Sequence, residues 1–197
     1  EFILDLQTHH VRDTMTGPTV FRSLTGKYGL NPVLSGTAPA KDSLHRANYV
    51  KEIFFDSDTV MACLTGAAFG PPDKYVLSAD DIVETRNLVN EAAGSRRMLA
   101  HGIGTVASAN WLEEAERQVR DLRIDAWKFY TGDPLQPWRH DDEKLVYPFY
   151  EKTLQLGVRN ICTHKGLPLP GPGADYFRPD DVLKAAKDWP DLNFIVF

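Results

Sequence analysis

This sequence of 197 residues lacks several features that define common protein classes. It has only two cysteines, Cys63 and Cys162, both inside apolar runs, so we expect buried free thiols rather than a disulfide framework or a cysteine metal cluster. Its net charge of -5 argues against nucleic-acid binding. No apolar run approaches the roughly 20 residues of a membrane span, and no secretory signal is visible. We therefore expect a cytoplasmic protein that binds neither nucleic acid nor membrane.

What the sequence does contain is an alternation of apolar, strand-like runs with amphipathic, helix-like segments. The runs are near-continuously apolar, as in strands covered on both faces. Strands are predicted at about 2–6, 59–64, 97–104, 124–130, 158–164 and 192–197, with helices at about 42–55, 78–93, 111–122, 142–156 and 178–187. Such alternation indicates a parallel sheet in an α/β protein. No GxGxxG motif follows the first strand, so a dinucleotide-binding fold is not favoured.

A (β/α)8 barrel fits the pattern best, because each predicted strand ends in polar residues or glycine, on the face where that fold places active sites. A barrel needs about 250 residues, whereas this chain stops inside its sixth predicted strand. We therefore expect one domain over residues 1–197 that comprises roughly the first six strand–helix units of a TIM barrel, truncated at its C-terminal end. An open sheet is the alternative.

One long segment, about residues 11–42, has no sustained periodicity and is repeatedly interrupted by glycine and proline. Long loops inside compact domains are usually functional or disordered. We interpret this one as an active-site loop, with Phe21 and Tyr28 as candidate lining residues. A surface excursion with short helical turns is the alternative.

Histidines end two of the predicted strands, although these strands lie far apart in the sequence. The first is followed by Gln7, His9 and His10, and the fifth ends at His164. The carboxyl ends of parallel strands meet at one mouth of a barrel, and imidazole is the commonest metal ligand. The pattern predicts a metal site with His9 and His164 as ligands. His10 is expected to point away from His9 and to form hydrogen bonds instead.

Further candidates lie at other strand ends and in the loop after the fourth strand. Lys128 is a candidate catalytic residue that could donate to a substrate carboxylate, and a buried lysine paired with an acid is the alternative. Arg139 suits a carboxylate through its planar fork. Ordinary packing or surface exposure is the alternative for each candidate substrate-binding residue, namely His101, Trp138, Arg139, His140 and Lys165.

These strand ends resemble those of the metal-dependent amidohydrolase superfamily, in particular its amidohydrolase-2 branch, which includes aminocarboxymuconate-semialdehyde decarboxylase. The resemblance lies in residues 5–9, 127–132, 162–166 and 193–197 and covers roughly the first three-quarters of such a barrel. The family carries His-x-His on strand one and a histidine on strand five. Gln7 stands in place of the first histidine, while His9 and His164 match the others. The resemblance places a strand-six histidine just past Phe197 and a strand-eight aspartate beyond it.

The resemblance implies a hydrolase that uses a divalent ion, zinc or alternatively manganese or iron, on a small carboxylated substrate. Non-oxidative decarboxylation of an aromatic or unsaturated acid is a second interpretation. A degenerate, non-catalytic barrel is a third, favoured by Gln7, because an amide oxygen is a weaker ligand than imidazole. Gln7 would then be a weak ligand or an orienting amide. A metal-free phosphate-binding barrel is the remaining class. We expect a homodimer, the commonest soluble oligomer.

Overall fold

The computed structural model describes residues 1–15, 44–68, 72–133, 136–167 and 173–197. Most of the predicted active-site loop, including Phe21 and Tyr28, lies outside these residues. None of the described helices is long and apolar enough to cross a membrane.

Six strands form one sheet in the order of the sequence, and every neighbouring pair is parallel. The prediction of a parallel α/β sheet is therefore confirmed. The strands are β1 (Leu4–Thr8), β2 (Met61–Leu64), β3 (Met98–Ile103), β4 (Ala126–Tyr130), β5 (Asn160–His164) and β6 (Asn193–Val196).

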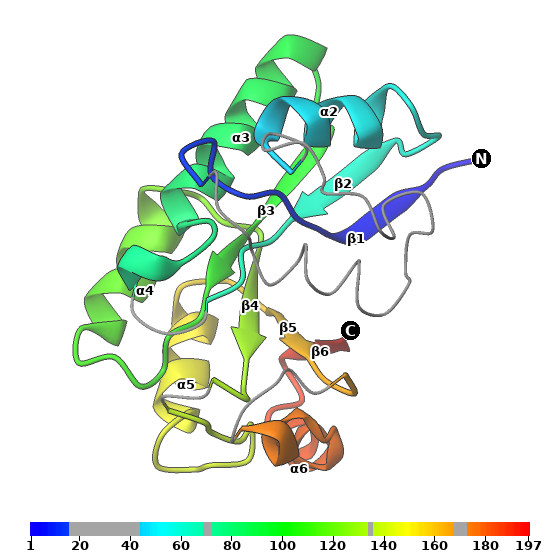
Figure 1. Cartoon of the computed structure of the whole chain (residues 1–197). Coiled ribbons are helices and arrows are strands. Elements are labelled where there is room, and N and C mark those ends of the chain that lie inside the picture. The colour runs from blue at the N-terminus through cyan, green and yellow to red at the C-terminus, as the bar shows by residue number, and fades with distance from the viewer. Residues whose placement is uncertain (16–43, 69–71, 134–135, 168–172) are drawn as a thin grey trace.

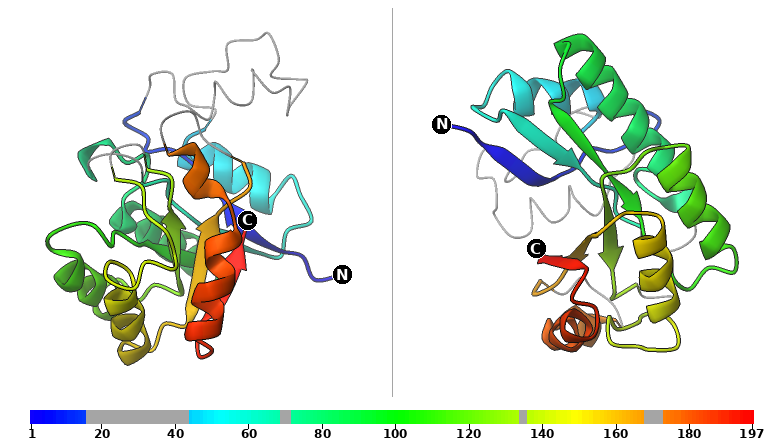
Figure 2. Two further views of the ribbon diagram at one scale, coloured as in Figure 1. Left: turned by 90° about the horizontal axis from the view of Figure 1, so that it is seen from below. Right: turned by 180° about the vertical axis from the view of Figure 1, so that it is seen from behind.

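Helices connect the strands and cover one side of the sheet (Figures 1 and 2). The α3 helix begins in a capping box between Ser78 and Asp81 and ends at Gly94, which adopts the left-handed conformation with φ of 59°. The α5 helix starts later than predicted, because the Asp142 carboxylate accepts backbone N–H groups of a preceding turn. The described helices are α2 (Arg46–Phe54), α3 (Ala79–Ala93), α4 (Trp111–Arg120), α5 (Tyr147–Gln155) and α6 (Asp180–Asp188), with short 3-10 turns η1 (Pro72–Lys74) and η2 (Ala174–Phe177).

The sheet curls into part of a barrel. Lys128 on β4 donates to Gln7 on β1 at 3.0 Å, although β2 and β3 lie between them in the sheet. His101 on β3 likewise contacts Cys162 on β5 at 3.6 Å across β4. Such contacts form only across a concave surface, which we call the inner face. The structure is a partial TIM barrel, as predicted, and the open-sheet alternative is set aside.

The main core lies on the opposite, outer side of the sheet, under the helices. Trp127 and Phe129 of β4 both pack against Phe149 of α5, with ring centroids 5.0 and 5.4 Å apart. Burial of each aromatic side chain stabilises the fold by roughly 1.5–3 kcal/mol. Because side chains alternate along a strand, this packing turns Lys128 and Tyr130 toward the inner face.

The first strand is less covered than the sequence predicted. Leu4 and Leu6 of β1 are 39% and 42% exposed, although the apolar run indicated a strand buried on both faces. Within the described residues β1 pairs only with β2 and so lies at an edge of the sheet, where side chains have fewer neighbours. The prediction of a fully buried first strand is wrong for this reason.

Candidate metal centre

His9 lies directly after β1 with both ring nitrogens in defined positions. Its Nδ1 is 2.9 Å from the carbonyl oxygen of Thr65. A carbonyl can only accept, so Nδ1 carries the proton and Nε2 keeps its lone pair. Burial, followed by the nearby Lys128 charge, lowers the pKa of His9 to about 4. At neutral pH His9 is thus a neutral imidazole with a fixed tautomer, which is the form that binds metal ions.

Gln7 and Lys128 complete the surroundings of His9. Lys128 Nζ donates to Gln7 Oε1 at 3.0 Å, and this contact orients the amide. The amide nitrogen of Gln7 then faces His9 Nε2 at 3.4 Å. In this arrangement the amide oxygen is held by Lys128, which favours Gln7 as an orienting amide over Gln7 as a metal ligand.

Lys128 itself is 2% exposed and points across the inner face. Its Nζ lies 4.2 Å from the ring centroid of Phe197 and 5.2 Å from that of Tyr130. Burial lowers its pKa to about 7. None of the ion pairs among the described residues includes Lys128, so the alternative of a lysine paired with an acid finds no support there.

His164 ends β5 on the same face. Its Nε2 donates to the carbonyl oxygen of Leu167 at 2.8 Å, which leaves the Nδ1 lone pair for a ligand. The ring stacks on Tyr130 and meets the edge of Phe177, each at 5.4 Å between centroids. Burial lowers the pKa of His164. The His164 imidazole is also near enough to contribute to the lowered pKa of His9.

These residues supply two neutral imidazoles with fixed tautomers, a donor set that fits part of a divalent-ion site. The set is incomplete within the described residues, where no group of three or more His, Cys, Asp or Glu side chains could hold a metal ion. Zinc sites use about four ligands, so other groups would have to complete the shell.

His101 is buried deeper on the inner face. Its Nε2 lies 3.6 Å from Cys162 Sγ, and its Nδ1 has no hydrogen-bond partner among the described residues. Burial, followed by the Lys128 charge, lowers the pKa of His101 to about 3. Burial raises the pKa of Cys162 to about 11, so the pair consists of a neutral imidazole and a thiol at neutral pH. Both cysteines are free and buried, as predicted.

The remaining predicted residues lie away from the inner face. His10 faces the outer layer, where it bonds Thr85 Oγ1 at 3.1 Å and packs against Tyr49, so the prediction that it points away from His9 is confirmed. Trp138 packs edge-on against Phe129, which belongs to the outer core. The structure does not bring His10 or Trp138 to the two imidazoles.

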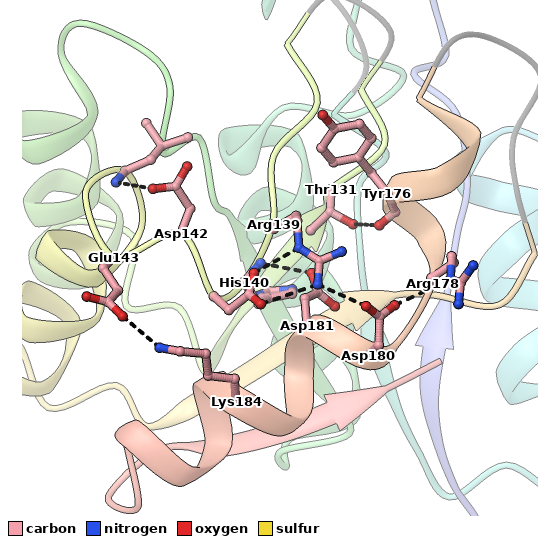
Figure 3. Close-up of polar contacts among 12 residues, drawn as sticks. Thr131, Arg139, His140, Asp142, Glu143, Tyr176, Arg178, Asp180, Asp181 and Lys184 are labelled. Atoms are coloured by element: carbon pink, nitrogen blue, oxygen red, sulfur yellow. Dashed lines mark hydrogen bonds and ion pairs between the residues drawn. The ribbon is translucent and has the colours of Figure 1, made fainter.

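Arg139 takes part in a surface cluster in the loop that leads to α5. Its guanidinium bonds Asp141 at 2.9 Å and Asp180 at 3.0 Å (Figure 3). These charge-assisted hydrogen bonds raise its pKa further. Arg139 is thus engaged by two carboxylates of the protein at the position where the sequence suggested a substrate carboxylate.

His140 and Lys165 meet at a buried carboxylate, Asp181, in the first turn of α6. Asp181 Oδ2 accepts from Lys165 Nζ at 2.8 Å. It also accepts from the His140 backbone N–H at 2.9 Å (Figure 3). The His140 ring is fully buried between Tyr150 and Thr163. These two predicted substrate-binding residues therefore form an internal network behind β5.

Acidification should weaken the fold through His140. Its folded-state pKa lies well below the ordinary value of about 6.5 because it is fully buried, so below pH 6.5 the unfolded chain binds the extra proton. Stability is therefore present above pH 6.5 and lost as the pH falls. Between pH 7.5 and 5.5 this one group should cost about 1.4 kcal/mol of unfolding free energy.

Urea unfolding at the two pH values checks this, with His140→Gln as the comparison. The variant should lose about 1.4 kcal/mol less than the parent over the same interval. Equal losses in both proteins would contradict a neutral His140.

Sequence reasoning missed three contributors to the site. The carbonyl groups of Thr65 and Leu167 set the histidine tautomers, and no side-chain signal marks a backbone acceptor. Tyr130, which stacks on His164, could have been found, because it lies two residues after Lys128 and so shares its face.

Comparisons with solved structures place this fold among known barrels. The chain superposes on 4-oxalomesaconate hydratase from Rhodopseudomonas palustris with a TM-score of 0.56 and 16% identity, covering 99% of this chain and 62% of that one. It superposes on 2,6-dihydroxybenzoate decarboxylase from Rhizobium with a TM-score of 0.54 and 18% identity, covering 100% of this chain and 66% of that one. It superposes on manganese-bound 5-carboxyvanillate decarboxylase from Novosphingobium aromaticivorans with a TM-score of 0.54 and 13% identity, covering 99% of this chain and 65% of that one.

This chain shares their barrel fold. It spans 62% to 66% of the length of these three enzymes. No protein-family model and no curated protein sequence matches it. The expected barrel fold is thus confirmed.

Proposed function

We propose that the chain belongs to a metal-dependent enzyme of the amidohydrolase type that acts on a small, carboxylated molecule. The observation that carries the proposal is the pair His9 and His164, two half-buried neutral imidazoles whose tautomers are fixed by backbone carbonyls. The shared fold supports it, because two of the similar structures contain manganese.

In this proposal His9 Nε2 and His164 Nδ1 hold a divalent ion, zinc or manganese. When bound, such an ion lowers the pKa of water or polarises a carbonyl or carboxylate oxygen. The Thr65 carbonyl keeps the His9 ring oriented, and an ion at His9 Nε2 would displace the Gln7 amide nitrogen that lies 3.4 Å from it. Lys128 Nζ supplies a hydrogen-bond donor on the inner face for an anionic group of the substrate. The aromatic rings of Tyr130 and Phe197 line the same face.

Hydrolysis and non-oxidative decarboxylation are both compatible with these groups. The decarboxylase interpretation is favoured by the similar structures, several of which are decarboxylases of aromatic acids. A carboxylated aromatic substrate would suit a face that combines a lysine with aromatic rings.

A degenerate, non-catalytic barrel is the second candidate. It is favoured by the Lys128 ammonium, which bonds Gln7 where the resemblance implies a histidine ligand. A positive charge at this position opposes a divalent cation.

The metal content of the protein decides between the metal-dependent enzyme and the degenerate barrel. The full-length protein, purified without chelators, should contain about one equivalent of a divalent metal by mass spectrometry, because neutral imidazoles are good ligands. Dialysis against a chelator should remove it, and zinc or manganese should restore it. Less than about a tenth of an equivalent after reconstitution would reject the enzyme and leave the degenerate barrel.

A further inference from the structure

A cavity of about 470 Å³ lies at the carboxyl ends of β3 and β4. We call it the rim cavity. It is bounded by the first turns of α3 and α4 and by residues that follow β2, β3 and β4. Its volume falls in the range that accommodates a small organic molecule. The groups proposed above for metal binding do not line it.

Rigid aromatic and apolar side chains form much of its wall. The rings of Tyr75, Tyr130 and Trp138 line it together with Ile103 and Val106, and each of these side chains is at most 9% exposed. Such walls suit a flat apolar ring, because aromatic pairs add to the free energy of burying area.

The charged part of the wall is acidic. Arg117 is its only cationic residue among the described positions, and four of its N–H groups are already used. It bonds both oxygens of Asp80 at 2.9 Å and both oxygens of Glu114 at 2.9 and 2.8 Å. Asp133 adds a third carboxylate to the lining. Two carboxylates thus engage the one guanidinium, and a third carboxylate lines the same cavity.

This charge balance selects the ligand. A ligand carboxylate or phosphate would meet repulsion from the three carboxylates, and Arg117 could receive it only by giving up Asp80 or Glu114. A protonated nitrogen would instead be attracted to the same carboxylates and to the faces of the aromatic rings.

We propose that the rim cavity is a ligand site for a small molecule that combines an aromatic ring with a protonated amine. The ring lies among Tyr75, Tyr130 and Trp138, and the amine faces Asp80 and Glu114. Tyr130 connects the cavity with the candidate metal centre, since its ring also stacks on His164. This site does not depend on the proposed metal.

Isothermal titration calorimetry of chelator-treated full-length protein tests the proposal. The probes are 2-phenylethylamine and 3-phenylpropionate, which have similar shapes and opposite charges. The amine should bind saturably at one site, and the carboxylate about tenfold more weakly or not at all.

Two variants and one control locate the site. Asp80→Asn combined with Glu114→Gln releases Arg117 and should reverse the preference of the cavity from the amine to the carboxylate. Ala107→Phe, which fills the cavity, should weaken both probes. Glu116→Gln removes one carboxylate charge from α4 outside the cavity, where Glu116 pairs with Lys152, and should leave amine binding unchanged. Thermal melting confirms that each variant is folded.

The proposal is overturned if the two probes bind the parent protein equally, if neither gives saturable heat, or if amine binding survives both the double substitution and Ala107→Phe. Because the protein is metal-free in these titrations, none of these outcomes bears on the metal centre.

Discussion

Replacing His164 with alanine is expected to abolish stoichiometric metal binding. The substitution removes one of the two imidazoles that keep an unprotonated ring nitrogen for a ligand. The affinity should fall by more than the roughly 10–100-fold that is lost with an outer hydrogen-bond partner of a ligand. Competition with a chromophoric chelator measures the dissociation constants of the parent and the variant.

The fold should survive this change. His164 is only partly buried, so loss of its contacts with Tyr130 and Phe177 should cost about 1–3 kcal/mol. His45→Ala is the matched control, because His45 precedes α2 and bonds the Met15 carbonyl instead of facing the inner side. An unchanged metal content in His164→Ala, or an equal loss in His45→Ala, would contradict the assigned site.

The fold could be predicted from the sequence because the patterns that mark its strands and helices are local and repeat along the chain. Apolar runs that end in polar residues mark β4 and β5, and Ser78 and Gly94 mark both ends of α3. The ends of helix α5 were harder, since a turn at Asp142 precedes it and its residues fit a helical pattern equally well.

The candidate site could be predicted only in part. The position of His9 and His164 at strand ends predicted them as ligands. The alternation of side chains along a strand predicted that His10 points away from His9. The orientation of the Gln7 amide depends on Lys128, 121 positions further along the chain, and no local pattern contains that contact. Arg139 bonds Asp180, and the His140 backbone N–H bonds Asp181. Both acids belong to α6, which follows the next strand, so no local pattern shows these contacts either.

Replacing Asp181 with alanine should destabilise the protein by about 3–5 kcal/mol, the usual cost of leaving a buried charge without its partner. The side chains of Lys165 and Asp181 are 0% and 1% exposed, and their ion pair is 2.8 Å long. Burial already lowers the pKa of Lys165, so its ammonium depends on this carboxylate. The substitution also removes the acceptor of the His140 N–H. Urea unfolding measures the change.

The neighbouring acid provides the control. Asp180 stands in the same turn of α6 but pairs at the surface with Arg139 and Arg178, so Asp180→Ala should leave the unfolding midpoint nearly unchanged (Figure 3). Lys165→Met combined with Asp181→Leu should recover part of the lost stability, because a buried ion pair can be replaced by apolar side chains of similar volume, while the His140 N–H still lacks its acceptor. If Asp181→Ala unfolds like Asp180→Ala, the buried pair does not stabilise this end of β5.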